Sequence, residues 1–275
     1  DPANLKNAVR NDTSKSVLGG NLISKVIILC LAAWLIGVSK AGFGGGIGML
    51  VTPMLIYIMP PKTVVGLMLP LLFSTDIFSL FHYWKRWDRQ NIVRLIPGAV
   101  LGIIIGSFIL NDISDVHLKK AIGGIACLFA ILSFFRSRLT PKNAVPPGEV
   151  WADSGVHFKV WHGVVAGILT GIFSTLAHVG GLVVTMYLLP QRLSNQEFVG
   201  TTTALYFLIN FVKIPFYIKL GLFTFNGLIE NIALLPYIAL GVIVGIYLNT
   251  RFSKDVFAGI ILFFVFATGI DLLFR

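Results

Sequence analysis

A glycine-rich stretch that contains a lysine is the part of this sequence best suited to binding chemistry. Six glycines lie within residues 37–48, inside an apolar run over 22–59. Each glycine in a helix interior costs about 1 kcal/mol relative to alanine, so we expect the helix to break here. A broken helix exposes N–H groups that bind anions, and Lys40 adds a positive charge. The stretch therefore predicts an anion site. Its central glycines are Gly44, Gly45 and Gly46.

The second half of the chain carries a counterpart of this stretch in residues 171–181, 134 positions downstream. At that offset Ser174 takes the place of the lysine, and His178 takes the place of a glycine. Two interrupted apolar segments at corresponding positions are the best sequence indication of a transporter's binding site. In this copy we expect Gly180 and Gly181 to supply the backbone N–H groups.

Two ionisable residues within the apolar part of the sequence have alternative interpretations that the sequence leaves open. Asp76 lies within an apolar segment, where acidic residues are candidates for function. Because a carboxylate repels an anion, we assign Asp76 either to proton coupling or to an ion pair with a lysine. His178 can titrate near neutral pH and is a second candidate for proton coupling, or else a satisfied core residue. It is also a candidate substrate-binding residue that would shape selectivity together with Ser174 and Thr202.

Lys40 and Lys213 are the candidate cations of the site, with Lys40 as the first choice. Either lysine could instead extend its ammonium to the membrane surface from near a helix end. Ser174 and Thr202 are candidate ligands for oxyanion oxygens, although such hydroxyls also bond back to helix carbonyls.

The composition describes a membrane protein that crosses the bilayer several times. The chain has 275 residues, of which 56% are hydrophobic and only 12% charged, against about 25% charged residues in soluble proteins. Apolar stretches of about 20 residues recur, the length needed to cross a bilayer core. The formal net charge is +10, but the basic residues cluster at segment ends, where they meet lipid headgroups. Nucleic-acid binding is therefore not expected.

The apolar pattern predicts an all-helical protein with about ten transmembrane segments. They are expected at 21–40, 45–59, 62–84, 91–110, 116–135, 160–177, 180–189, 198–218, 228–248 and 256–273. We divide the chain into a polar N-terminal arm (1–20), a first membrane repeat (21–136), a linker (137–158) and a second membrane repeat (159–275). Whether segments one, two, six and seven span the membrane or re-enter it stays open.

The two halves repeat one pattern and are expected to have opposite orientations. A Pro-x4-Gly-x3-Gly frame at residues 97–106 recurs at 236–245. Each half has an odd number of crossings on either count, so the second half is inverted relative to the first. An inverted repeat places the binding site between the halves, near the bilayer midplane.

The duplicated glycine motif resembles that of the TauE/SafE family of sulfite and organosulfur-anion exporters, over nearly all of residues 22–274. The residues that carry the resemblance are Gly42, Gly44, Gly45, Gly46, Pro53, Val65, Gly66, Val199 and Gly200. The resemblance implies transport of sulfite, sulfonates or related oxyanions across the cytoplasmic membrane. The second copy departs from the motif at His178 and at Tyr187, which stands at the proline position.

The sequence and the resemblance together predict a multi-pass secondary transporter of the cell inner membrane that exports sulfite or a related small organosulfur anion by alternating access. A passive anion channel is the alternative, and an intramembrane enzyme using Asp76 and His178 is disfavoured. We expect no enzymatic activity, no cofactor and no metal site, because no Cys/His cluster or nucleotide-binding loop occurs. The expected partners are a small anion (sulfite, sulfonate or similar) and membrane lipids, with a homodimer left open.

Overall fold

The computed structural model describes residues 22–43, 51–139, 159–188, 191, 193–223, 231–251, 266 and 270–274. The expected N-terminal arm, most of the expected linker and most of the tenth segment lie outside these residues. The central glycines of the first motif, Gly44, Gly45 and Gly46, also lie outside them.

Within these residues the protein is all-helical. The helices are α2 (Leu22–Phe43), α3 (Val51–Ile56), α4 (Pro61–His82), α5 (Arg89–Asp112), α6 (Asp115–Leu139), α7 (Val160–Ala177), α8 (Gly181–Leu188), α9 (Asn195–Lys219) and α11 (Leu235–Arg251). Four described helical stretches are long and apolar enough to cross a membrane: Pro61–His82, Arg89–Asp112, Val160–Ala177 and Gln196–Lys219. Shorter apolar stretches are Val26–Gly42 and Leu235–Leu248. The fold is thus that of a polytopic helical membrane protein.

Local sequence signals explain where the long helices begin. Asp88 caps α5 by accepting a 2.7 Å hydrogen bond from the backbone N–H of Asn91. Ser194 and Glu197 form a capping box at the start of α9, each side chain accepting from the other's backbone N–H. Proline at the first position of α4 suits a helix start, because the N–H that proline lacks would have no partner within the helix at that position.

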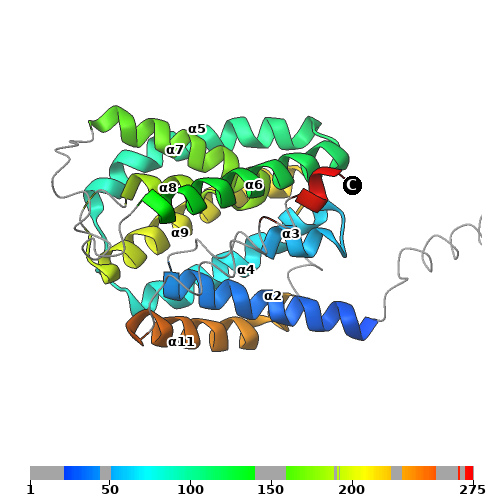
Figure 1. Cartoon of the computed structure of the whole chain (residues 1–275), viewed down its shortest axis with the longest axis horizontal. Helices are drawn as coiled ribbons and strands as arrows, with labels where there is room; N and C mark the ends of the chain where they lie inside the picture. Colours follow the sequence, from blue (N-terminus) through cyan, green and yellow to red (C-terminus); the bar gives the residue numbers. More distant parts are fainter. Residues whose placement is uncertain are drawn as a thin grey trace, which may run out of the picture.

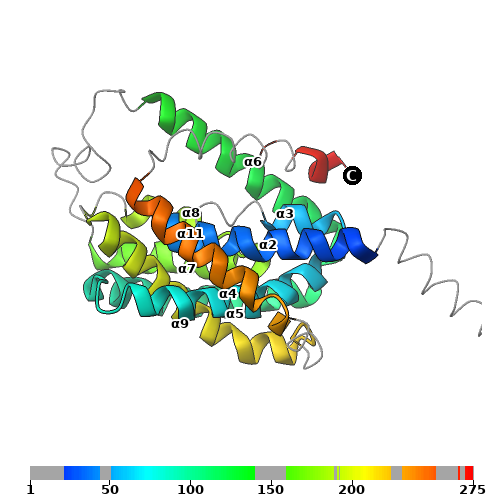
Figure 2. The ribbon, with the colours of Figure 1, turned by 90° about the horizontal axis from the view of Figure 1, so that it is seen from below.

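The helices form three layers (Figure 1). α2 packs along α11 on one side, α5 packs along α7 on the other, and α4 and α9 lie between these pairs. Figure 2 shows the same molecule from below, with α11 crossing in front of α2 and α6 along one edge. The contacts of the middle layer with both pairs place α4 and α9 at the centre of the protein.

Glycines bring the backbones of the two outer pairs into direct contact. A Cβ added at Gly102 of α5 would lie 2.1 Å from the carbonyl oxygen of Ile168 in α7. A Cβ added at Gly241 of α11 would lie 2.3 Å from the carbonyl oxygen of Trp34 in α2. Small residues allow such close helix contacts in membranes.

The first segment, expected to end at Lys40, extends three residues further, and the expected helix break within 37–48 does not fall at its first two glycines. α2 continues through Gly37 and Gly42 to Phe43. Both glycines pack against the backbone of α11, Gly42 against Gly245. Tertiary packing of this kind overrides the low helix propensity of glycine.

The helix boundaries of the two halves correspond at the sequence offset of 134. α2 ends at Phe43 and α7 at Ala177, while α4 begins at Pro61 and α9 at Asn195. α4 and α9 also run antiparallel. Gly66, near the start of α4, packs against Leu222, which follows α9. Gly200, near the start of α9, packs against Arg86, which follows α4.

Candidate functional site

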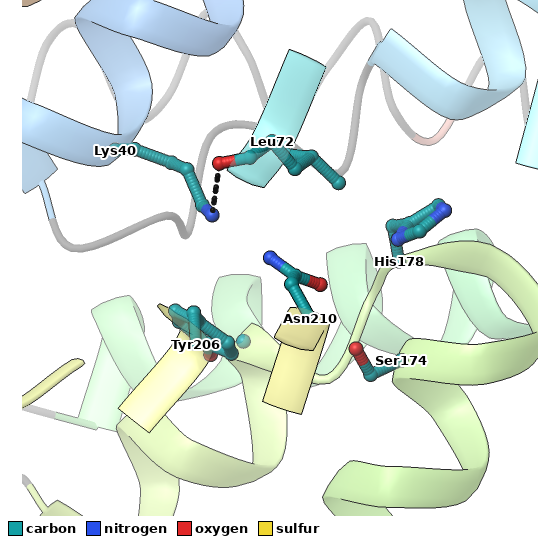
Figure 3. A pocket seen from close by; sticks show the side chains of 7 residues that line it. Lys40, Leu72, Ser174, His178, Tyr206 and Asn210 are labelled. Atoms are coloured by element: carbon teal, nitrogen blue, oxygen red, sulfur yellow. Dashed lines mark hydrogen bonds between the residues drawn. The ribbon is translucent and has the colours of Figure 1, made fainter. Parts of the chain in front are cut away.

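A buried ion pair joins α2 to α4 at the centre of the protein. Lys40, in the last turn of α2, is 6% exposed, and its Nζ forms a salt bridge with Oδ1 of the fully buried Asp76. The same ammonium donates a 3.3 Å hydrogen bond to the carbonyl oxygen of Leu72, one turn earlier in α4 (Figure 3). Lys40 therefore lies inside the protein and does not extend to its surface.

The second oxygen of Asp76 contacts the other half of the chain. Asn210 of α9 donates a 2.7 Å hydrogen bond from Nδ2 to Asp76 Oδ2. Both carboxylate oxygens thus accept a bond from a side-chain donor, as suits an ionised carboxylate, which can only accept. The structure contains the ion pair predicted for Asp76, and its role in proton coupling stays a prediction.

Lys213 of α9 forms a second buried cluster with the end of α7. Its side chain is fully buried, and its Nζ donates to the carbonyl oxygen of Ser174 (3.1 Å) and to Ser174 Oγ (3.0 Å). Ser174 lies in the last turn of α7, where helix carbonyls lack partners within the helix and carry partial negative charge. A third contact, of 3.1 Å, joins Lys213 Nζ to His178 Nδ1.

The hydrogen bonds of His178 define its protonation state. Its Nε2 lies 2.9 Å from the carbonyl oxygen of Val65. Because a carbonyl only accepts, Nε2 carries the proton, and Nδ1 is left as the acceptor for Lys213. With Lys213 as an ammonium, these contacts suit a neutral imidazole with both nitrogens in use. His178 caps α7 in the left-handed conformation, with φ 56° and ψ 25°, which is uncommon for a residue other than glycine.

A small cavity lies between the two lysine clusters. It is lined by Lys40, Leu72, Ser174, His178, Gly181, Tyr206 and Asn210. Its volume is about 20 Å³, which is enough for roughly one water molecule. In Figure 3, Lys40 lies on one side of Asn210, and Ser174 and His178 lie on the other. Both halves of the chain contribute to the lining.

The start of α8 also lines this cavity, through Gly181. The first N–H groups of a helix have no partner within the helix and attract anions. Gly180, one residue earlier, packs against α7, where an added Cβ would lie 2.7 Å from the carbonyl oxygen of Thr170. Close packing is thus a sufficient reason for a glycine at position 180.

Thr202 does not lie among the residues that line the cavity. Its hydroxyl is buried in α9 and donates a 3.0 Å hydrogen bond back to the carbonyl oxygen of Val199. Lys213 does not line the cavity itself either, but it bonds to Ser174 and His178, which do.

Tyr206 is a cavity residue that the sequence interpretation missed. The Lys40 ammonium lies 5.2 Å from the centre of its ring, within the range of cation–π attraction. Its buried hydroxyl has no hydrogen-bond partner among the described residues. An available signal was its position, since Tyr206 lies 134 residues after Leu72, the cavity residue that accepts a bond from Lys40.

Two tyrosines hold the ends of α2 and α7 in the same way. Tyr83 donates a 2.9 Å hydrogen bond to the carbonyl oxygen of Ala41, and Tyr217 donates a 2.7 Å bond to that of Thr175. Donors and acceptors are both 134 residues apart. Each acceptor lies in the last turn of its helix, where carbonyls need an outside partner. The two helix ends beside the cavity are thus fixed by equivalent contacts.

A cavity with polar side chains from both halves of the chain is typical of membrane transporters, whose sites lie between two halves of the chain. The chain belongs to the sulfite exporter TauE/SafE family, whose family model matches residues 29–272. The comparisons with curated proteins and with solved structures gave no match. Membership in this family implies a multi-pass membrane exporter of sulfite or organosulfur anions.

Proposed function

We propose that this protein is a secondary transporter that exports sulfite or a related small organosulfur anion across the cytoplasmic membrane by alternating access. Its site would be the cavity between the two lysine clusters, with Lys40 and Lys213 as the cations. Ser174, Tyr206 and the start of α8 at Gly181 would supply hydrogen-bond donors to the oxyanion.

The observation that carries this proposal is the pair of buried lysines beside a cavity lined by both halves. A buried ammonium is costly unless an anion or several acceptors surround it. Lys40 has Asp76 as its partner, whereas the described contacts of Lys213 are with uncharged groups: the acceptors of Ser174 and His178, and the ring of Tyr217, whose centre is 5.8 Å away. A bound oxyanion between them would complete the charge balance.

The size of the cavity favours a cycle with a closed state. A cavity of about 20 Å³ holds roughly one water molecule, whereas sulfite has four heavy atoms. Binding of the anion therefore requires the helices around the cavity to separate. Lys40, at the end of α2, and Ser174, at the end of α7, are positioned to follow such a movement.

The proposal includes the inverted repeat of two five-segment halves. Its support is the antiparallel course of α4 and α9, the equivalent ends of α2 and α7, and the equivalent tyrosine contacts. In a cell that is negative inside, the membrane potential favours export of an anion by about 2.3 kcal/mol per charge per 100 mV. Export can therefore proceed without an imposed proton gradient.

The test is anion flux in proteoliposomes that contain the purified protein. Sulfite and methanesulfonate uptake would be compared between wild type, Lys40→Ala and the control Lys219→Ala, which removes an exposed lysine at the end of α9. Removal of one charge-assisted bond predicts a loss of about tenfold to hundredfold for Lys40→Ala. The control should retain wild-type flux.

Size-exclusion chromatography would verify that each variant is folded. Saturable flux that accelerates when the opposite side contains substrate indicates a carrier, while flux without either property indicates a channel. Imposed potential and pH gradients separate uniport from proton coupling. Unchanged flux in Lys40→Ala would exclude Lys40 from the site, and no flux of either anion in wild type would contradict the proposed function.

A further inference from the structure

The buried charges around the cavity add up to a single positive charge. Among the described residues, the charged side chains that are buried are Lys40, Asp76 and Lys213. Two lysines and one aspartate give a formal sum of +1. The ionised form of Asp76 is consistent with its contacts, because both of its oxygens accept from donors, Lys40 Nζ and Asn210 Nδ2.

This net charge has no compensating acid in the part of the chain that the structure describes. Lys213 donates to neutral acceptors, two from Ser174 and one from His178. The partial negative charge at the end of α7 offsets part of the ammonium's charge, equivalent to about half an elementary charge. The remaining imbalance lies beside a cavity that Ser174 and His178 line.

We propose that the site selects singly charged oxyanions, such as hydrogensulfite or a sulfonate, over doubly charged ones, such as the sulfite dianion or sulfate. One negative charge on the anion neutralises the formal charge of +1 left by Lys40, Asp76 and Lys213. The carboxylate of Asp76 already neutralises one lysine, so the second charge of a dianion has no cation to balance it. Asp76 is then the specificity-determining residue for substrate charge. This inference rests on the proposed function and names the charge class of its substrate.

The position of Asp76 suits a fixed internal charge. It is fully buried in α4 and does not itself line the cavity. It reaches the cavity through Lys40 and Asn210, the two lining residues to which it is hydrogen-bonded. A dianion bound beside these residues would meet the field of the carboxylate, and like charges brought together in a dry interior are strongly unfavourable.

Methanesulfonate and sulfate provide a matched pair of probes. Each has five heavy atoms, a tetrahedral sulfur and the four atoms bonded to it, and the two differ in a methyl group against a fourth oxygen. Methanesulfonate carries one negative charge and sulfate two at neutral pH. Calorimetric titration of the purified protein with each anion measures binding without requiring transport.

The wild-type protein should bind methanesulfonate more tightly than sulfate by about tenfold or more. In Asp76→Asn the buried side chains carry a formal charge of +2, so the ratio of the two affinities should shift toward sulfate by a similar factor. The matched control is Asp112→Asn, an exposed aspartate at the end of α5, for which the ratio should not change. Lys213→Met should weaken binding of both anions, while Lys219→Met should not.

The wild-type comparison tests the inference even where a variant fails to fold. Sulfate binding as tight as methanesulfonate binding in wild type would overturn it. A ratio that stays unchanged in folded Asp76→Asn would overturn the role of Asp76. If neither probe binds and sulfite flux is also absent, the proposed function itself fails. If the protein transports sulfite but binds methanesulfonate no more tightly than sulfate, the charge selection alone is refuted.

Discussion

Asp76 and Asn210 occupy the same position in the two halves of the chain, 134 residues apart, and they are hydrogen-bonded to each other at 2.7 Å. Under the proposed two-fold arrangement, only residues close to the axis can contact their own counterparts. The axis would therefore pass near these two side chains. A site on the axis is equally close to both sides of the membrane, as alternating access requires.

Substitution of the interface glycines should destabilise the protein. Gly102→Ala and Gly241→Ala would place a Cβ 2.1 Å and 2.3 Å from backbone carbonyl oxygens of the neighbouring helices. We expect a loss of about 1–3 kcal/mol for each, because the backbones must move apart. Thermal unfolding in detergent measures the effect.

Gly124→Ala in α6 is the control for this experiment. An added Cβ there would lie 3.8 Å from its nearest neighbour, a side-chain atom of Leu273. Alanine should leave the stability unchanged or increase it by up to about 1 kcal/mol, as expected from helix propensity. Equal unfolding temperatures for Gly102→Ala and Gly124→Ala would contradict the close packing of α5 against α7.

Removal of Lys40 alone should destabilise the protein more than removal of both charges of the Lys40–Asp76 pair. Lys40→Met leaves a buried carboxylate without its cation, for which we expect a loss of about 3–5 kcal/mol. The double variant Lys40→Met/Asp76→Asn removes both charges and should recover most of that loss. Its sulfite flux should nevertheless stay low, since the cation is still absent.

Unfolding temperature and flux, measured on the same preparations, would separate the structural role of the pair from its role in binding. Lys219→Met serves as the reference for loss of an exposed lysine. Recovery of flux together with stability in the double variant would indicate that the ion pair is structural only.

Substitutions at His178 should reveal its left-handed backbone. Both His178→Gly and His178→Ala lose the ring's bonds to Val65 and Lys213. Alanine must in addition adopt φ near 56°, which costs an L-residue roughly 1–2 kcal/mol. The glycine variant should therefore be the more stable of the two, the reverse of the order in a helix interior. Thermal unfolding would measure the order, and a more stable alanine variant would contradict this backbone conformation.

The two tyrosine contacts should contribute similarly to stability. Tyr83→Phe and Tyr217→Phe each leave a buried helix-end carbonyl, at Ala41 or Thr175, without its tyrosine donor. We expect a loss of about 1–3 kcal/mol for each variant, and roughly additive losses in the double variant if the contacts are independent. Thermal unfolding of the three variants provides the comparison. A large loss of stability for only one of the two variants would show that the two tyrosine contacts have equivalent geometry but contribute unequally to stability.

The sequence predicted the helices well where apolar patterns and terminal signals agree. The segment predicted at 160–177 coincides with α7, and proline at position 61 placed the start of α4 to within one residue. The end of α2 was placed too early, because glycine propensity indicated a break where contact with α11 maintains the helix. Such a contact joins residues about 200 positions apart, and local propensity carries no information about it.

The sequence also identified the three buried charged residues around the cavity, but not all of their partners. Lys40, Asp76 and Lys213 stood out because charges are rare at membrane depth. The contacts of Asp76 with Asn210, and of Lys40 with the ring of Tyr206, depend on the rotation of α9 against α2 and α4. The left-handed cap at His178 was likewise hidden, because glycine is the residue usually found there.

The glycine interfaces have a mechanical consequence. α5 belongs to the first half and its close partner α7 to the second, while α2 belongs to the first and its close partner α11 to the second. Sliding or separating either pair would disturb direct backbone contacts along its length. In the proposed transport cycle we therefore expect these mixed pairs to move as rigid bodies, each with one helix from the first half and one from the second. Motion is expected where they meet α4 and α9, so a cross-link within a pair should be tolerated, whereas one from a pair to α4 or α9 should arrest transport.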